Sequence, residues 1–284
     1  MKALKNIFVG MLIGIGAISP GVSGGALAMI FGVYQELVNA VGNLFKDIKK
    51  NLTYLIPIGI GVGVSVVILS GILKSLFESY PMQTSFTFAG LITGTLPILF
   101  KHANKKGFNK LNIIPFVATF AFAIFLSILD TGFDTSNMPT EIDLNVVNIF
   151  LLAFYGFVLA GSLVIPGISG SVLLSMMGAY FIVLNAMKKL NPLVSANAEF
   201  IHSISVLIPM GIGLALGVLI FSKLMDFLLK KHYSITYYAI LGFVIGSVSE
   251  FVQDFQGGAT GIISIVGFVL GLVLSYGLSR FEKD

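Results

Sequence analysis

Two short segments of the chain combine proline, glycine and serine in the same order. Residues 20–25 read Pro-Gly-Val-Ser-Gly-Gly, and residues 166–171 read Pro-Gly-Ile-Ser-Gly-Ser. Proline removes a backbone donor and glycine adopts conformations closed to other residues, so each segment would break a helix. A glycine-rich turn that opens into a helix leaves backbone N–H groups available to an anion, and Ser23, Ser169 and Ser171 add hydroxyl donors. The two motifs therefore predict an anion-binding site.

A structural interpretation of the same residues is that glycine and serine merely allow membrane helices to pack closely. Two copies that each combine Pro, Gly and Ser favour the binding interpretation. The chain has no cysteine and only three scattered histidines, so neither thiolate sites nor a metal centre is indicated. We expect no metal and no cofactor.

The composition indicates an integral membrane protein. Hydrophobic residues make up 56% of the chain and charged residues 11%, whereas about a quarter of the residues are charged in a soluble domain. Most of the surface must therefore face lipid. Helices satisfy their own backbone groups there, so the apolar runs predict an all-α fold.

The sequence also contains an internal repeat. Residues 10–41 align without gaps with 156–187, with ten of 32 positions identical, and residues 55–97 align with 207–249. Shared apolar composition does not explain why Pro, Gly, Tyr and Asn coincide in the same order. The repeat predicts a duplication with two equivalent halves.

We expect the first repeat at residues 4–133, an outer linker at 134–147 and the second repeat at 148–281. Each repeat is predicted to hold one re-entrant or short helical hairpin and three transmembrane helices. These are hairpin 6–45 with helices 54–77, 85–100 and 111–130, and hairpin 148–187 with helices 204–228, 235–251 and 260–278.

Lysine and arginine predict the orientation. With a cytoplasmic N-terminus, 14 of the 17 basic residues fall on the inner side, and only Lys74, Lys188 and Lys189 fall outside. A hairpin returns the chain to its starting side, and three crossings then carry it across. The second repeat therefore starts outside, which predicts inverted topology, an architecture that recurs in secondary transporters. We expect the protein in the inner membrane of a bacterial cell, with both termini in the cytoplasm.

The paired Pro-Gly-x-Ser-Gly-[Gly/Ser] motifs, each followed by Gly-x-Tyr, resemble the PopT family of bacterial polyprenyl-phosphate translocases. The resemblance covers nearly the whole chain. It implies that the protein returns undecaprenyl phosphate, a carrier lipid of envelope synthesis, from the outer to the inner leaflet. It also implies headgroup contacts from both motifs, with Tyr34 and Tyr180 as further candidates: Pro20, Gly21, Ser23, Gly24, Gly25, Pro166, Gly167, Ser169, Gly170 and Ser171.

Energetics favour an ion-coupled transporter. Moving one negative charge inward against the membrane potential costs about 2.3 kcal/mol per 100 mV, so H⁺ or Na⁺ is an expected partner. Glu36 is the acid inside the first hairpin and a candidate coupling residue, although it also fits an interfacial charge. No catalytic residue and no nucleic-acid partner are expected.

Two alternatives stay open. One is a carrier for a small soluble anion. The other is a polyprenyl-pyrophosphate phosphatase, which would need an acid–base group and an arginine near the phosphate; the sole arginine, Arg280, lies at the C-terminal tail.

Two further predictions concern the interactions of polar residues outside the motifs. Asp226 is expected to pair locally with Lys223, one helical turn away. The repeated Asn39 and Asn185 are expected to form hydrogen bonds between helices.

Overall fold

The computed structural model describes residues 2–18, 24–132, 139–189, 197–252 and 255–279. Within these ranges the chain is helical and contains no strand, as the sequence predicts. The helices are α1 Lys2–Ile18, α2 Gly24–Ile30, α3 Tyr34–Gly42, α4 Ile48–Ser79, α5 Pro81–Thr93, α6 Leu96–Ala103, the 3₁₀ turn η1 Lys110–Asn112, α7 Ile113–Gly132, α8 Val146–Val164, α9 Gly170–Met176, α10 Tyr180–Lys188, α11 Asn197–Lys231, α12 Tyr233–Val252 and α13 Gly258–Ser279.

The described helices identify a multi-pass membrane protein. Four of them, α7, α8, α11 and α13, are long and apolar enough to cross a bilayer. A fifth crossing arises if α9 and α10 are counted as one bent span, since these helices meet at an angle of 115°. Large hydrophobic side chains such as Ile263, Val273 and Leu274 of α13 are more than half exposed, as lipid-facing positions are.

Both hairpins bend for the same local reason. Gly32, between α2 and α3, has φ +64°, and Gly178, between α9 and α10, has φ +67°. Each glycine ends its helix in a Schellman motif: Val33 N–H donates to the Ala28 carbonyl, and Ala179 N–H donates to the Leu174 carbonyl. A β-carbon is unfavourable in this left-handed conformation, so glycine specifies the turn.

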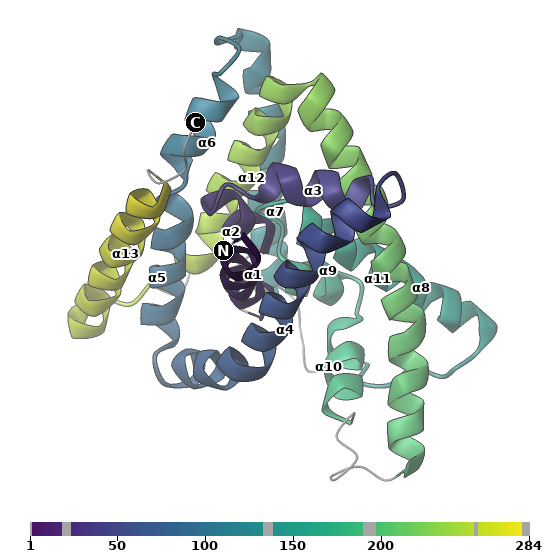
Figure 1. The fold of residues 1–284 in the computed structure, drawn as a ribbon. Helices are drawn as coiled ribbons and strands as arrows, with labels where there is room; N and C mark the ends of the chain where they lie inside the picture. Colours follow the sequence, from purple (N-terminus) through teal and green to yellow (C-terminus); the bar gives the residue numbers. More distant parts are fainter. Residues whose placement is uncertain (1, 19–23, 133–138, 190–196, 253–254, 280–284) are drawn as a thin grey trace.

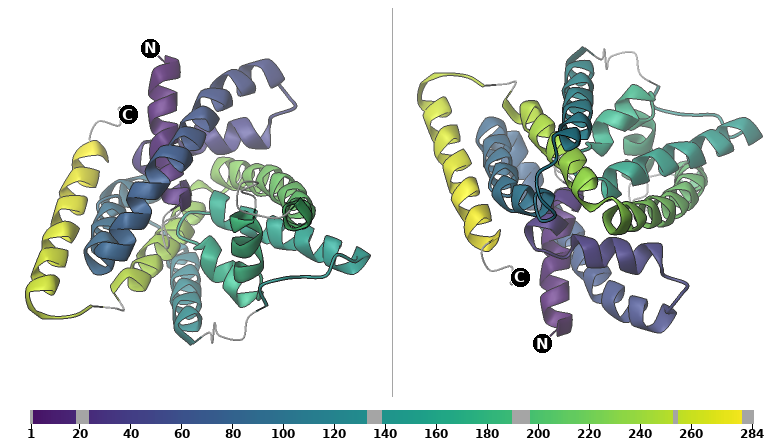
Figure 2. Two further views of the ribbon diagram at one scale, coloured as in Figure 1. Left: turned by 90° about the horizontal axis from the view of Figure 1, so that it is seen from below. Right: turned by 90° about the horizontal axis from the view of Figure 1, so that it is seen from above.

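Four long helix pairs build the body of the molecule: α1 with α4, α8 with α11, α5 with α13, and α7 with α12. Helix α13 lies at one edge, α8 lies at the opposite edge, and α1 lies between them (Figures 1 and 2). The α1–α4 and α8–α11 pairs use glycine at the closest approach. A β-carbon on Gly10 would collide with the Ile58 carbonyl, and one on Gly156 with the Met210 carbonyl.

One predicted segment, residues 85–100, contains two helices in the structure. Helix α5 ends at Thr93, and α6 begins at Leu96. Pro97, at the second position of α6, cannot donate a backbone hydrogen bond to Thr93, so the ladder is interrupted there. The interruption leaves an opening beside α12.

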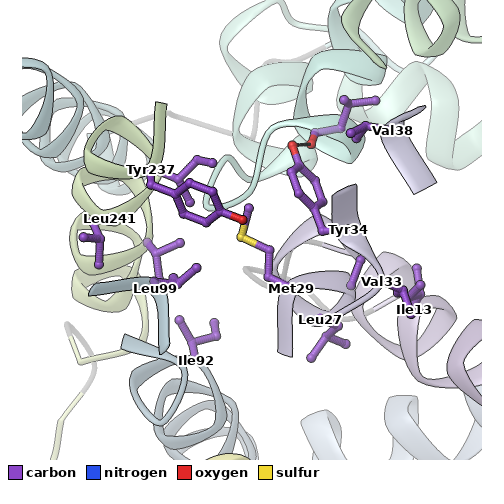
Figure 3. Close-up of a cluster of buried hydrophobic side chains, with 14 of the residues drawn as sticks. Ile13, Leu27, Met29, Val33, Tyr34, Val38, Ile92, Leu99, Tyr237 and Leu241 are labelled. Atoms are coloured by element: carbon purple, nitrogen blue, oxygen red, sulfur yellow. Dashed lines mark hydrogen bonds between the residues drawn. The ribbon is translucent and has the colours of Figure 1, made fainter. Parts of the chain in front are cut away.

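The largest hydrophobic cluster lies where both hairpins and α12 meet. Its buried residues come from α1, α2, α3, α4, α5, α6, α8, α11 and α12, with Val33 in the turn between α2 and α3, and Figure 3 shows part of it around Met29, Tyr34 and Tyr237. This cluster fixes the first hairpin relative to the second half of the chain.

Candidate functional site

The second Pro-Gly-Ser motif forms a tight turn between α8 and α9. Pro166 is fully buried directly after α8, and Gly167 has φ +86°. A β-carbon on Gly167 would lie 2.7 Å from the backbone of Phe243 on α12. Glycine is therefore required both by the backbone conformation and by the close approach of α12.

Two hydroxyl groups face each other at the start of α9. Ser169 is the N-cap residue, but its side chain makes no capping hydrogen bond. Instead, the Ser169 and Ser171 hydroxyl oxygens lie 2.9 Å apart and share a hydrogen bond. Gly170 packs between them against Leu159 and Ser162. Because neither serine caps the helix, their hydroxyl groups keep donor and acceptor positions that a ligand could use.

The first motif lies partly outside the described residues, which omit Pro20, Gly21 and Ser23. Gly24 and Gly25 begin α2 and are buried. A β-carbon on Gly25 would lie 3.3 Å from the Val164 carbonyl oxygen and 3.4 Å from the Pro166 ring. Motif residues 141 positions apart in the sequence are therefore neighbours in space.

Tyr34 connects the first hairpin to the second motif. The side chain is 3% exposed, and its hydroxyl donates a 2.8 Å hydrogen bond to the Val164 carbonyl (Figure 3). This carbonyl belongs to the last turn of α8, where no helical partner is available. Tyr180 lies differently, with its ring packed edge-on against Phe181. The two repeated tyrosines therefore have different environments.

Glu36 lies in the first turn of α3 and is exposed. It lines two polar cavities, one of about 540 Å³ and one of about 270 Å³. The neighbouring Tyr54 hydroxyl is buried and lacks a hydrogen bond of good geometry, although the Glu36 carboxylate lies near it. The structure thus places the candidate coupling residue in the walls of two cavities whose described linings do not include Ser169 or Ser171.

The predicted pairing of Asp226 with Lys223 is wrong. Asp226 accepts a 2.7 Å hydrogen bond from Lys230, four residues later. It also accepts hydrogen bonds of 2.8 Å from Asn39 on α3 and of 2.9 Å from Asn43, the residue directly after α3. Helical spacing alone permits Asp226 to pair with either Lys223 or Lys230. No feature of the sequence predicts its contact with Asn39, which lies 187 positions earlier.

The repeated asparagines also differ. Asn39 bonds across helices as expected, whereas Asn185 donates to the Thr140 carbonyl, which precedes α8 in a non-helical segment. Helix–helix bonding is therefore wrong for Asn185. Lys189, directly after α10, pairs with Glu141 at 2.7 Å and with Glu199 at 3.3 Å.

The hydrogen bond from Lys189 lowers the pKa of the exposed Glu141 carboxyl below its ordinary value. A depressed carboxyl pKa contributes stability that is present above the unfolded-state pKa and is lost as the pH falls through the folded-state value. The tie between α10 and the linker is therefore unchanged near neutral pH and weakens only in acid.

Within the described ranges, no three His, Asp or Glu side chains gather closely enough to hold a metal ion.

Comparison with known proteins agrees with this membrane fold. The sequence profile of the undecaprenyl phosphate translocase-like family matches residues 13–264. A polyprenyl-phosphate transporter of Staphylococcus aureus is 30% identical over 285 aligned positions, covering 98% of this chain and 97% of that protein. A polyprenyl-phosphate transporter of Vibrio cholerae is 24% identical, covering 88% of this chain and 78% of that protein. No solved structure matches significantly. The chain belongs to the undecaprenyl phosphate translocase-like family.

Proposed function

We propose that this protein flips a polyprenyl phosphate, with undecaprenyl phosphate as the physiological form, from the outer to the inner leaflet of the bacterial inner membrane. The carrier lipid would thereby become available again for envelope synthesis. The observation that carries the proposal is the meeting of the two motifs, with Gly25 of the first against Pro166 of the second. The names of the Staphylococcus and Vibrio relatives agree with this substrate class.

The headgroup would be held by neutral donors. Ser169 and Ser171 supply hydroxyl groups, and the turn before α9 supplies backbone N–H groups. We assign the same role to the first motif, including Pro20, Gly21 and Ser23. Neutral donors suit transport, because a buried lysine or arginine would bind a phosphate tightly and slow its release.

An inverted arrangement of two halves would let the site face each leaflet in turn. The matching lengths of the helices support the duplication that such an arrangement requires. Helices α2 and α9 both have seven residues, α3 and α10 both have nine, and the long helices α4 and α11 each contain an internal proline. We propose cytoplasmic termini on the basis of the lysine distribution.

Proteoliposomes that carry a labelled polyprenyl phosphate in the outer leaflet test the function. The purified protein is expected to accelerate inward movement of the lipid. The Ser169→Ala/Ser171→Ala double variant should lose most of this rate, and Ser205→Ala, an α11 serine that bonds only within its own helix, should keep it. Competition by polyprenyl phosphate but not by inorganic phosphate separates lipid transport from a soluble-anion carrier. Release of phosphate from a polyprenyl pyrophosphate would instead indicate the phosphatase.

Coupling to H⁺ or Na⁺ is the finer part of the proposal. Several charged or titratable side chains line the same two cavities as Glu36. They are Lys50 and Tyr54 of α4, Asp226 and Lys230 of α11, Tyr233 of α12, His102 of α6, and Lys105, which follows α6. If protonation of Glu36 drives the cycle, Glu36→Gln should abolish the dependence of flux on a pH gradient. Wild-type flux that ignores separately clamped pH, Na⁺ and potential would exclude coupling.

A further inference from the structure

One side of α12 borders three hollows in succession. Tyr233 lines both polar cavities, Tyr237 lines the smaller one, and Leu241 and Ile245 line a third hollow of about 460 Å³. These four residues are spaced four apart, so they form one gently winding ridge of the helix. The ridge runs from polar to apolar surroundings over about 18 Å.

The third hollow, which we call the α6 groove, is apolar. It is lined by residues of α5, α6, α12 and α13, including those at the interruption between α5 and α6. No charged side chain occurs in its described lining, which consists of Thr93, Gly94, Leu96, Pro97, Phe100, Leu241, Ile245, Leu272 and Tyr276. An apolar groove of this kind suits a hydrocarbon chain.

The smaller polar cavity, which we call the α3 cavity, offers hydrogen-bond donors and the positive charge of Lys105, and the Glu36 carboxylate also lines it. Lys105 lines it and forms no ion pair with any carboxylate in the described part of the chain. His102 Nδ1 lies 2.7 Å from the Tyr233 hydroxyl. The first turn of α3 also lines it through Tyr34, Gln35 and Glu36, and the N-cap residue Val33 has no side chain that can cap the amides of this turn.

Helix α6 contributes to both hollows. Leu96, Pro97 and Phe100 line the groove, whereas His102 and the following Lys105 line the α3 cavity. Leu99 is 2% exposed and packs in the same cluster as Tyr237 and Leu241 (Figure 3). The two hollows are therefore held at a fixed separation by one short helix and one long one.

We infer that the α3 cavity and the α6 groove together bind one amphipathic lipid, with its phosphomonoester in the cavity at Lys105 and its polyprenyl chain in the groove. This inference rests on the proposed function. It places a second substrate site on α12, at the lysine-rich end of the molecule and apart from the two Pro-Gly-Ser motifs.

The two parts of this site would contribute differently. A groove in a membrane gains little hydrophobic free energy, because the surrounding lipid is equally apolar. The groove would therefore select the shape of the chain, and the phosphate contacts in the α3 cavity would supply most of the affinity. Removing Lys105 should weaken binding more than filling the groove.

Binding to the full-length protein in nanodiscs tests the phosphate part. The probes are a 55-carbon polyprenyl phosphate, the five-carbon dimethylallyl phosphate, and the 55-carbon alcohol. Lys105→Gln should weaken binding of both phosphates about tenfold, the effect of one charge-assisted hydrogen bond, and leave the alcohol unchanged. Lys110→Gln, an exposed lysine in the same loop, is the matched control. Equal affinities in these two variants would overturn the phosphate site.

Leu96→Trp tests the groove part, because the larger ring would occupy it. Binding of the long phosphate should weaken severalfold, and binding of dimethylallyl phosphate, which is too short to reach the groove, should not change. Ile265→Trp, at an exposed position of α13 outside the groove, is the control. Equal effects of Leu96→Trp and Ile265→Trp on the long phosphate would overturn the groove.

A second measurement does not depend on tolerance of a larger side chain. A photoreactive phenylalanine analogue at Phe100 should capture the 55-carbon phosphate, and the same analogue at the exposed Phe150 should not. Capture at neither position, or at both equally, would overturn the groove. If the wild-type protein transports the lipid while every variant behaves as its control, the second site is wrong and the proposed function stands. If the wild-type protein neither binds nor transports it, both fail.

Discussion

Asp226 is the residue on which the attachment of the first hairpin depends. The residue is 9% exposed, and its carboxylate accepts hydrogen bonds from Asn39, Asn43 and Lys230. Hydrogen bonds to a charged group contribute more than neutral ones, and a buried amide left without its partner is costly. One side chain on α11 thus fixes the position of α3.

We expect Asp226→Asn to lower the free energy of unfolding by about 2 kcal/mol, because two asparagine amides would face another amide in place of a carboxylate. Urea unfolding in detergent, followed by circular dichroism, measures the loss. Lys223→Gln removes the lysine that the sequence pairs with Asp226 and should leave stability unchanged. A loss with Lys223→Gln as large as that with Asp226→Asn would contradict the observed pairing.

At the scale of the helices, close packing depends on glycine at positions where two backbones touch. Gly156 of α8 lies against the Met210 carbonyl of α11, while Gly211 of α11 has no neighbour within 4 Å. Any side chain at the first position must push the two helices apart, whereas the second position has open space.

Gly156→Ala is therefore expected to lower the thermal transition of the detergent-solubilised protein by several degrees, as a loss of 1–2 kcal/mol would. Gly211→Ala should leave it unchanged or raise it, since alanine favours the helix by roughly 1 kcal/mol over glycine. The transition is followed by size-exclusion chromatography after heating. Equal effects of the two substitutions would mean that the α8–α11 contact does not limit stability.

The helices themselves could be predicted from the sequence, because long apolar runs bounded by charged residues have few alternatives in a membrane. The turn of the second motif could be predicted from Pro166 and Gly167. The pairing of α5 with α13 and of α7 with α12 could not. Side chains that face lipid and side chains that face another helix are equally apolar, so the sequence does not distinguish them.

The candidate site shows the same division. The sequence predicts that the motif residues bind the headgroup, which stays a prediction, and the structure places Gly25 beside Pro166. The sequence did not indicate the cavities around Glu36, because their walls come from α3, α4, α6, α11 and α12. The sequence also did not indicate that the Tyr34 hydroxyl would donate a hydrogen bond to the Val164 carbonyl. Such contacts depend on the final helix positions.

At the scale of the whole molecule, the transport cycle that we propose would require the second hairpin to change its contacts. Asn185 of α10 donates a 3.0 Å hydrogen bond to Thr140, near the start of α8. Because the chain has no cysteine, a Thr140→Cys/Asn185→Cys pair can be cross-linked selectively. We expect the cross-link to stop lipid flux in proteoliposomes and its reductive cleavage to restore flux. Each single-cysteine variant with the same reagent is the control, and undiminished flux in the cross-linked protein would mean that this hairpin stays in place.

The buried Asp226 carboxylate holds α3 of the first half, whereas α10 of the second half is tied by the ion pair between the partly buried Lys189, directly after it, and the exposed Glu141. Two identical halves in opposite orientations would make the inward-facing and outward-facing conformations equal in energy. A clamp on one half alone removes this degeneracy, and a difference of about 1.4 kcal/mol is enough to populate one conformation tenfold over the other. Without bound lipid, the protein would then mostly adopt the conformation that faces one leaflet. The sequence differences between the halves would determine which leaflet that is.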